Sequence, residues 1–357
     1  MNPLQRQAGL DVFRSIAILV VVLGHGLPLL QAANTAFPYI PLPDGVEMFF
    51  VLSGFLIGQI LLRVPVFDTQ NLLHFWSRRW LRTLPAYYVI LILNIVLSKV
   101  HLIGASPEAI TWHFWVFTQN LAWPFQGFFW ESWSLAVEEW FYLLFPLIAC
   151  LLTYSLRLSS RQAFVFVLCL FFIVPLGLRY WHFQQLESLD DFQYDISFRK
   201  VVLLRLDAIA FGLLMAYLKV TFEKAFHQYR YVLLVLALGL QYYLWHLDLP
   251  TYSAGLTVWR FSLLGITYAC ALPFIDSLRK VPLQGFFTFT SKISYSLYLT
   301  NLLWVELITT SYPPSNYTAL HAILIYGGYW LITYGSSYLL YRYIEQPVMR
   351  WRDKRFA

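Results

Sequence analysis

Charged side chains are scarce in this sequence. Asp, Glu, Lys and Arg together make up 12% of the 357 residues, whereas 59% of the residues are hydrophobic. The mean hydropathy is +0.58, which lies far outside the range of soluble domains. The shortage of charge therefore excludes an ordinary soluble enzyme and predicts an integral membrane protein.

Cysteine is scarce as well. The three cysteines, Cys150, Cys169 and Cys270, lie in apolar segments, and none of them belongs to a CxxC pair. This spacing fits neither a metal site nor a disulfide framework. We interpret the three side chains as small core residues, and we expect no metal and no permanently bound cofactor.

Long apolar runs recur along the whole chain. Runs of about 18 or more residues can cross a bilayer as helices, and they lack the alternating pattern of a β-barrel. We predict an all-α integral membrane protein with about ten transmembrane helices. The expected spans lie near residues 12–30, 45–62, 84–102, 134–153, 162–179, 201–218, 231–247, 255–275, 293–310 and 322–343. The first run shows no cleavage site of a signal peptide, so we keep it as a span.

The basic residues predict the orientation. If the N-terminus is cytoplasmic, 18 of the 25 Lys and Arg residues fall in cytoplasmic segments. The positive-inside rule then favours both termini in the cytoplasm and a multi-pass protein of the cell membrane. The distribution of basic residues on the cytoplasmic side thus explains the net charge of +6. No nucleic acid is expected as a partner. Without an internal repeat or an appended soluble domain in view, we expect one polytopic domain over residues 1–357.

The stretch FRSIAILVVVLGHG at 13–26 places two ionisable side chains in the first span. Arg14 and His25 are eleven residues apart, about three helical turns and ~16 Å, so they share one helix face. Arg14 could snorkel to the headgroups or pair with Asp11, and His25 could be satisfied by a neighbouring helix. Charges inside a span are costly and often functional. His25 is therefore also a candidate general base for a hydroxyl group.

Carboxylates open the second span. Asp44 and Glu47 in PDGVEMFFVLSGFLIG have the spacing of a capping box, which would explain both structurally. Glu47 also lies near the outer mouth, close in sequence to His25. We interpret Gly54, in the same stretch, as a glycine that lets two helices pack closely.

A second pair of carboxylates lies in WESWSLAVEEWFYLLFP, where Glu138 and Glu139 fall inside a span without a capping signal. Adjacent helical residues point about 100° apart, so at most one of them faces the bundle axis. Glu138 shares its face with Ser134, and we expect Glu138 to point inward and to hydrogen-bond His25.

Arginines mark two further places. In SRRWLRTLPAYY, Arg79 and Arg82 lie one turn apart on a short helix expected to end near Pro85. They could be a topological anchor or a seat for a phosphate group. In LRLDAIAFGLLMA, Arg205 and Asp207 are two residues apart, so each is expected to pair elsewhere.

Eight stretches, taken in order, make the chain similar to the membrane acyltransferase-3 family. They are LDVFRSIAILVVVLGH, GVEMFFVLSGFLI, RRWLRTLPAYY, TQNL, SWSLAVEEWFYL, RLDAIAFGLLMA, SKISYSLYL and YRYIEQP. The resemblance implies transfer of an acyl group, often acetyl, from a cytoplasmic acyl-CoA to a hydroxyl of a carbohydrate or glycolipid beyond the membrane.

The resemblance also implies roles for individual residues. Residues that match Arg14, His25, Arg79 and Arg82 are associated with activity in the family. Several further residues are candidates for supporting or acceptor-side roles: Glu47, Asn120, Tyr142, Arg205 and Asn301. Asn301 departs from the family, which usually has a histidine there, and an asparagine cannot take a proton near neutrality.

These residues together predict one mechanism. Arg79 and Arg82 would hold the phosphates of acyl-CoA, Arg14 would orient the donor, and His25, oriented by Glu138 or Glu47, would deprotonate the acceptor. An acyl-enzyme intermediate on His25 or a serine is an alternative. A transporter of a lipid-linked sugar or an organic substrate is the competing function, because charges within spans also mark transport pathways. A scaffold without catalysis would require Arg14, His25 and Glu138 all to be structural.

Overall fold

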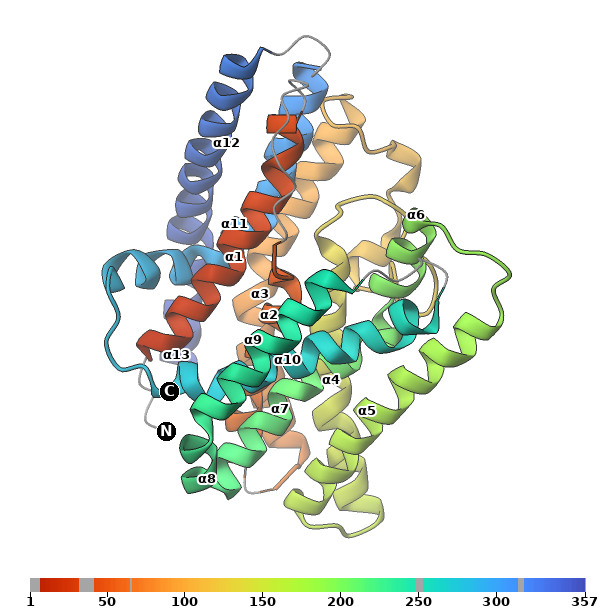
Figure 1. Ribbon diagram of the computed structural model, residues 1–357, viewed down its shortest axis with the longest axis vertical. Helices are drawn as coiled ribbons and strands as arrows, with labels where there is room; N and C mark the ends of the chain where they lie inside the picture. The colour runs from red at the N-terminus through yellow and green to blue at the C-terminus, as the bar shows by residue number, and fades with distance from the viewer. Residues whose placement is uncertain (1–6, 32–41, 65, 248–252, 314–317, 357) are drawn as a thin grey trace.

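A computed structural model describes residues 7–31, 42–64, 66–247, 253–313 and 318–356, and this part of the chain is helical without any strand. Each of the ten segments expected from the sequence contains a helix (Figure 1). The ten long helices are α1 (Ala8–Gln31), α2 (Gly45–Leu61), α3 (Thr69–Lys99), α4 (Ser132–Ser155), α5 (Ser160–Gln184), α7 (Leu206–Thr221), α9 (Arg230–His246), α10 (Arg260–Ser277), α11 (Gln284–Ser311) and α12 (Ala319–Leu340). Shorter helices are α6 (Asp191–Tyr194), α8 (Glu223–Gln228) and α13 (Gln346–Arg355).

Five helices within the described residues are long and apolar enough to cross a membrane. They comprise α1, α3, α4, α5 and the segment Gly255–Ser277, in which a π-helical turn leads into α10. Helices α2, α7 and α9 have 17, 16 and 17 residues, fewer than the roughly 20 that a bilayer requires. Helix α11 is long enough but carries serines, threonines and Asn301 along its length. The all-helical fold is thus confirmed, with five candidate membrane-spanning helices among the described residues.

Helix α3 corrects one expected boundary. The sequence predicts a break near Pro85, but α3 runs without interruption from Thr69 to Lys99 with this proline inside it. A membrane helix tolerates proline where neighbouring side chains satisfy the backbone carbonyls of the affected turn. Around this proline, side chains add hydrogen bonds to the helix: Tyr295 donates a 2.9 Å bond to the carbonyl of Thr83, and the Thr83 hydroxyl bonds Glu139 of α4 at 2.8 Å. The arginine pair therefore belongs to a long helix instead of a short one.

Two close helix pairs organise the bundle. Helix α1 lies along α11 and α12 (Figure 1), and its Ser15 donates a 2.7 Å hydrogen bond to the carbonyl of Phe287. Helix α2 lies along α7, where a Cβ added to Gly54 would lie 2.0 Å from the carbonyl oxygen of Ile209. A Cβ on Gly212 would lie equally close to the carbonyl oxygen of Val51. Gly54 is thus a packing glycine, as the sequence predicts.

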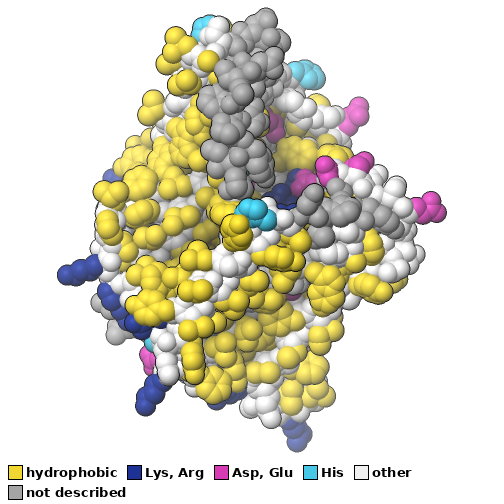
Figure 2. Space-filling view, in the orientation of Figure 1, with side chains coloured by type: hydrophobic (Ala, Val, Ile, Leu, Met, Phe, Trp, Pro, Cys, Tyr) yellow, Lys and Arg dark blue, Asp and Glu magenta, His cyan; other side chains and the backbone are white. Residues whose placement is uncertain are grey.

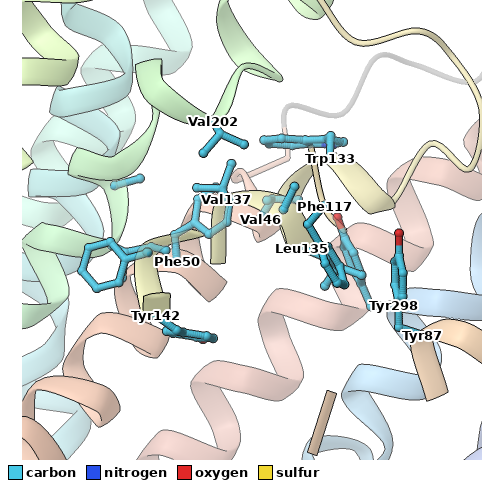
Figure 3. Close-up of a cluster of buried hydrophobic side chains, with 14 of the residues drawn as sticks. Val46, Phe50, Tyr87, Phe117, Trp133, Leu135, Val137, Tyr142, Val202 and Tyr298 are labelled. Carbon is cyan, nitrogen blue, oxygen red and sulfur yellow. The ribbon is translucent and has the colours of Figure 1, made fainter. Parts of the chain in front are cut away.

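Buried aromatic and aliphatic side chains fill the space between α2, α3 and α4. Figure 3 shows Val46 and Phe50 of α2 near Leu135 and Val137 of α4, all within one hydrophobic cluster. Of the cysteines, Cys150 and Cys270 are half-buried, and Cys150 packs against this cluster. Cys169 is exposed on α5, so its interpretation as a core residue is wrong. A small apolar side chain is equally suited to a helix surface that faces lipid.

The two ends of the bundle differ in charge. At one end, here called the basic end, lie the start of α3 with Arg78, Arg79 and Arg82, the start of α5 with Arg161, and α13 with Arg352. The opposite, acidic end carries Asp44, Glu131, Asp190 and Asp195. In Figure 2 most of the visible basic side chains lie in the lower half and most of the acidic ones in the upper half, separated by a hydrophobic surface.

The connection between α3 and α4 covers the acidic end. It contains two short 3-10 turns, Pro107–Ala109 and Trp112–Trp115, and is otherwise irregular. The hydroxyls of Tyr87 and Tyr88 donate to the carbonyls of Phe114 and Trp115 at 2.7 and 2.8 Å. Trp112 is exposed, as expected of an interfacial tryptophan. These bonds attach the connection to α3.

The contact between α2 and α7 predicts opposite effects of two glycine substitutions. Gly54→Ala should lower the stability of the protein by about 1–3 kcal/mol, because its methyl group would overlap the backbone of α7. Gly177→Ala in α5 is the control, because nothing lies within 4 Å of its added Cβ. That change should be neutral or stabilising through helix propensity. Thermal unfolding of the purified variants in detergent measures both, and equal midpoints would contradict the close packing.

Candidate functional site: a cavity between α1, α2, α3, α4 and α11

A cavity of about 640 Å³ lies inside the bundle, between α1, α2, α3, α4, α11 and the C-terminal helices. This volume is typical of sites for small molecules and cofactors. The lining begins at the basic end with Arg352 and the exposed Lys292, and extends to Val46, Ser134 and Tyr298. Along α2 the lining runs from Ile60 to Val46, which corresponds to about 20 Å of helix.

Basic side chains outnumber acidic ones in this cavity. The basic lining residues are Arg14, Arg79, Arg82, Lys292 and Arg352, and the acidic ones are Asp11, Glu138 and Asp353. Asp353 already pairs with Arg352 at 2.8 Å and with Arg78 at 3.4 Å. Among the described residues neither Arg79 nor Arg82 forms an ion pair or a side-chain hydrogen bond. The cavity therefore suits an anionic ligand.

Tyr142 of α4 connects several of the lining residues. Its hydroxyl lies 2.5 Å from the hydroxyl of Ser53 and donates to Glu138 at 3.1 Å. The guanidinium carbon of Arg79 lies 5.5 Å from the centroid of the Tyr142 ring, within cation–π range. The Tyr142 backbone accepts a 2.9 Å bond from Trp76. Tyr142 thus holds Arg79 and Glu138 in fixed places at the cavity wall.

A pair of hydroxyls closes the cavity toward the acidic end. Ser134 and Tyr298 both line it, and their hydroxyl oxygens are 2.5 Å apart. Figure 3 shows the Tyr298 hydroxyl among the buried aromatic side chains of this region. Four of the lining residues are not predicted from the sequence as site residues: Ser53, Tyr298, Lys292 and Arg352. Serine and tyrosine are too common in this sequence to stand out.

His25 lies beyond this closure and does not line the cavity. Its Nδ1 is 2.6 Å from Oδ1 of Asn301, which follows Tyr298 by three residues on α11. Three residues of helix, a rise of about 4.5 Å, therefore separate the end of the cavity from the partner of His25. Arg14 and His25 share α1, and Arg14 lines the cavity while His25 lies nearer the acidic end.

The expected hydrogen bond between Glu138 and His25 is wrong. Glu138 accepts its bond from Tyr142, and His25 is bonded to Asn301. The physical reason is depth: Glu138 lies four residues beyond Ser134, about 6 Å nearer the basic end, whereas His25 lies past Tyr298 on the acidic side. Glu138 does face inward, as expected, and is part of the cavity wall.

Glu47 is not the partner of His25 either. It forms a buried ion pair with Arg205, whose side chain is completely buried and lies 3.8 Å from the ring centroid of Phe261. Asp44 caps α2 as predicted, accepting from the amides of Val46 and Glu47 at 3.1 and 3.2 Å. The Glu47 side chain does not return to the cap, since a buried guanidinium is the stronger partner for a carboxylate. Neither Glu47 nor Arg205 lines the cavity.

Asn120 is likewise outside the cavity. Its side-chain nitrogen Nδ2 donates to the carbonyls of Trp133 and Lys200, at 3.1 and 2.5 Å. The backbone of Val202 donates to the carbonyl of Asn120 at 2.9 Å. Asn120 therefore joins the α3–α4 connection to the segment that precedes α7.

Two basic residues near the acidic end are held by carboxylates and tryptophans. Arg199 pairs with Asp44 and Asp195 at 3.2 and 3.3 Å, and stacks on Trp133. Burial alone would lower the pKa of Arg199, but Asp44 and Asp195 raise it above its ordinary value. Lys200 also pairs with Asp195, yet burial lowers its pKa. These cations are locally neutralised.

No metal site emerges from the part of the chain that the structure describes. In those residues no three His, Cys, Asp or Glu side chains gather closely enough to hold an ion. The polar groups of the cavity include arginines, Lys292, hydroxyls and carboxylates, which can bind an anion and orient a carbonyl group.

Comparison with known proteins shows which family the chain belongs to. The family model of the acyltransferase domain matches residues 7–342. The O-acetyltransferase OatA of Staphylococcus aureus (strain NCTC 8325 / PS 47) is 32% identical over 185 residues, which cover 48% of this chain and 28% of the relative. OatA of Staphylococcus aureus (strain COL) gives the same values. The match thus spans little more than a quarter of the length of these relatives, and no solved structure matches the chain. Because the family model covers nearly the whole chain, the protein belongs to the acyltransferase-3 family of membrane acyltransferases.

Proposed function

We propose that the protein transfers an acetyl group from cytoplasmic acetyl-CoA to a hydroxyl of an extracytoplasmic or lipid-linked carbohydrate. The observation that carries the proposal is the position of the cavity. It begins at the basic end, contains Arg14, Arg79 and Arg82, and stops three residues of α11 short of Asn301, the partner of His25. Acetyl and hydroxyl are chosen because the relatives are named O-acetyltransferases.

The proposed orientation follows from charge. The positive-inside rule would put the basic end, with both termini, in the cytoplasm, and all ten long helices would then cross the cell membrane. The cavity would open toward the compartment that supplies acyl-CoA. We keep the prediction that residues 1–357 act as one domain.

Arg79 and Arg82 are the proposed seat of the donor phosphates. They lie one turn apart on α3, line the cavity, and have no carboxylate partner among the described residues. Guanidinium groups bind phosphate oxygens by paired hydrogen bonds. Arg14, deeper in the cavity on α1, would guide the acyl arm toward Ser134 and Tyr298.

His25 is the proposed general base. Its ring would take the proton of the acceptor hydroxyl while that oxygen attacks the thioester carbonyl. The new bond joins the acceptor oxygen to the acyl carbon, the carbon–sulfur bond breaks, and the proton passes to the leaving thiolate. In this proposal Glu138 acts from the donor side, where it accepts the hydrogen bond of Tyr142.

A transporter would need the same intramembrane charges but no reaction. The family match favours transfer over transport, because the matching model is that of an acyltransferase domain. Acetylation of a carbohydrate by the purified, reconstituted protein would distinguish the two functions.

Substitution of the arginine pair tests the donor seat. Arg79→Ala and Arg82→Ala should each raise the KM for acetyl-CoA at least about tenfold, because a hydrogen bond to a charged group contributes about 1.5–3 kcal/mol. Acetyl-pantetheine, which lacks the nucleotide phosphates, should serve wild type and variants equally well. Arg161→Ala is the control, since Arg161 lies at the same end but bonds Tyr217 and Thr221 outside the cavity. An unchanged KM in both variants would refute the seat.

Substitution of His25 tests the base. His25→Ala should lower kcat by about 10²- to 10⁴-fold, the usual contribution of general acid–base catalysis. Binding of acetyl-CoA, measured by calorimetry, should remain, because His25 does not line the cavity. The control is His246→Ala on α9, whose exposed ring bonds the carbonyl of Tyr242 one turn earlier in the same helix. Near-normal turnover of the His25 variant would remove this residue from the chemistry.

A further inference from the structure

The orientation of the Asn301 side chain is determined by its surroundings. Asn301 is completely buried on α11. Its Nδ2 lies 3.0 Å from the carbonyl oxygen of Leu297 and 2.7 Å from that of Tyr298. Both oxygens only accept hydrogen bonds, and the amide nitrogen has two hydrogens to donate. The reversed amide would place Oδ1 against two carbonyl oxygens, so the hydrogen-bond network selects the orientation with Nδ2 toward Leu297 and Tyr298.

This orientation leaves the amide oxygen facing His25. Oδ1 of Asn301 is 2.6 Å from Nδ1 of His25. An amide oxygen has no hydrogen, so Nδ1 of His25 must donate. In a neutral imidazole one nitrogen carries the hydrogen and the other has the lone pair. The lone pair of His25 is therefore on Nε2.

We propose that Asn301 is a positioning residue that fixes His25 in the tautomer with the hydrogen on Nδ1, so that Nε2 is the atom that accepts the proton from the acceptor hydroxyl. The catalytic part rests on the proposed function, whereas the tautomer depends only on the Asn301 contacts. Triad enzymes assign the same task to a carboxylate. Here an uncharged amide performs it, and neither Glu138 nor Glu47 reaches His25.

A spectroscopic experiment on the unaltered protein tests the tautomer directly. The full chain is purified with nitrogen-15 in its histidines, and the resonances of His25 are assigned by their loss in His25→Gln. We expect a hydrogen-bearing Nδ1 and a bare Nε2 at a pH where the ring is neutral. A hydrogen on Nε2, or an equal mixture of tautomers, would overturn the proposal whether or not the protein is an acyltransferase.

A matched pair of asparagine variants tests the catalytic consequence. Asn301→Ala removes the acceptor of Nδ1, and should lower kcat at least about 10²-fold, as misplacing a catalytic proton does. The KM for acetyl-CoA should change less than about threefold, and the His25 resonances should become those of mixed tautomers. Asn94→Ala is the control: Asn94 is also buried in a helix, donates to the carbonyl of Ile90 at 2.9 Å, and lies outside the cavity.

The outcomes separate the tautomer from the proposed function. If Asn301→Ala keeps both the wild-type kcat and the wild-type tautomer, Asn301 does not position His25. If the tautomer is as expected but His25→Ala remains active, the assignment of Asn301 stands and the proposed role of His25 as base fails. If Asn301→Ala does not fold, the measurement on the unaltered protein still decides the tautomer.

Discussion

A charged side chain buried between helices needs its countercharge inside the protein, because lipid and packed apolar side chains provide none. Arg179 of α5 holds Asp207 of α7 by two hydrogen bonds of 2.8 and 2.7 Å, and Arg205 holds Glu47 of α2. All four side chains are at most 2% exposed. Removing one partner of such a pair costs about 3–5 kcal/mol. Helices α2, α5 and α7 thus form a fixed frame, beside which the cavity lies.

Within the part of the chain that the structure describes, the arginines Arg79 and Arg82 of the cavity have no such countercharge within ion-pair distance. Arg79 rests on the ring of Tyr142, and among the described residues neither it nor Arg82 has a carboxylate partner. The structural pairs are closed, whereas the cavity retains positive charge that a ligand can neutralise. Because Arg205 and Glu47 belong to the first kind and Arg79 and Arg82 to the second, the pattern of pairing distinguishes residues that hold the bundle together from those suited to bind an anion.

Much of this fold could be predicted from the sequence, because long apolar runs bounded by charge have few solutions in lipid. The bounds of α2 and α4 agree with prediction within two residues. The start of α3 differs from prediction, because the first turns of this helix are polar and Pro85 indicated the end of a separate short helix. The partner of Glu47 could not be predicted at all: Arg205 lies 158 residues away in sequence. Spacing along one helix shows which residues share a face, but it does not show what the neighbouring helix offers at that depth.

The packing of α1 against α11 places Asn301 beside His25. Asp11 accepts a 2.8 Å bond from Ser291 near the basic end, and His25 bonds Asn301 nearer the acidic end. The two contacts fix the relative position of the helices over about 20 Å of α1. From the sequence alone Asn301 is a departure from the resemblance, which implies a histidine there, because an asparagine cannot take a proton near neutrality. A histidine at 301 could accept from Nδ1 of His25 only through an unprotonated nitrogen, whereas the amide oxygen of Asn301 accepts at every pH. Asn301 therefore lacks the titratable group of a histidine but provides the acceptor that faces Nδ1 of His25.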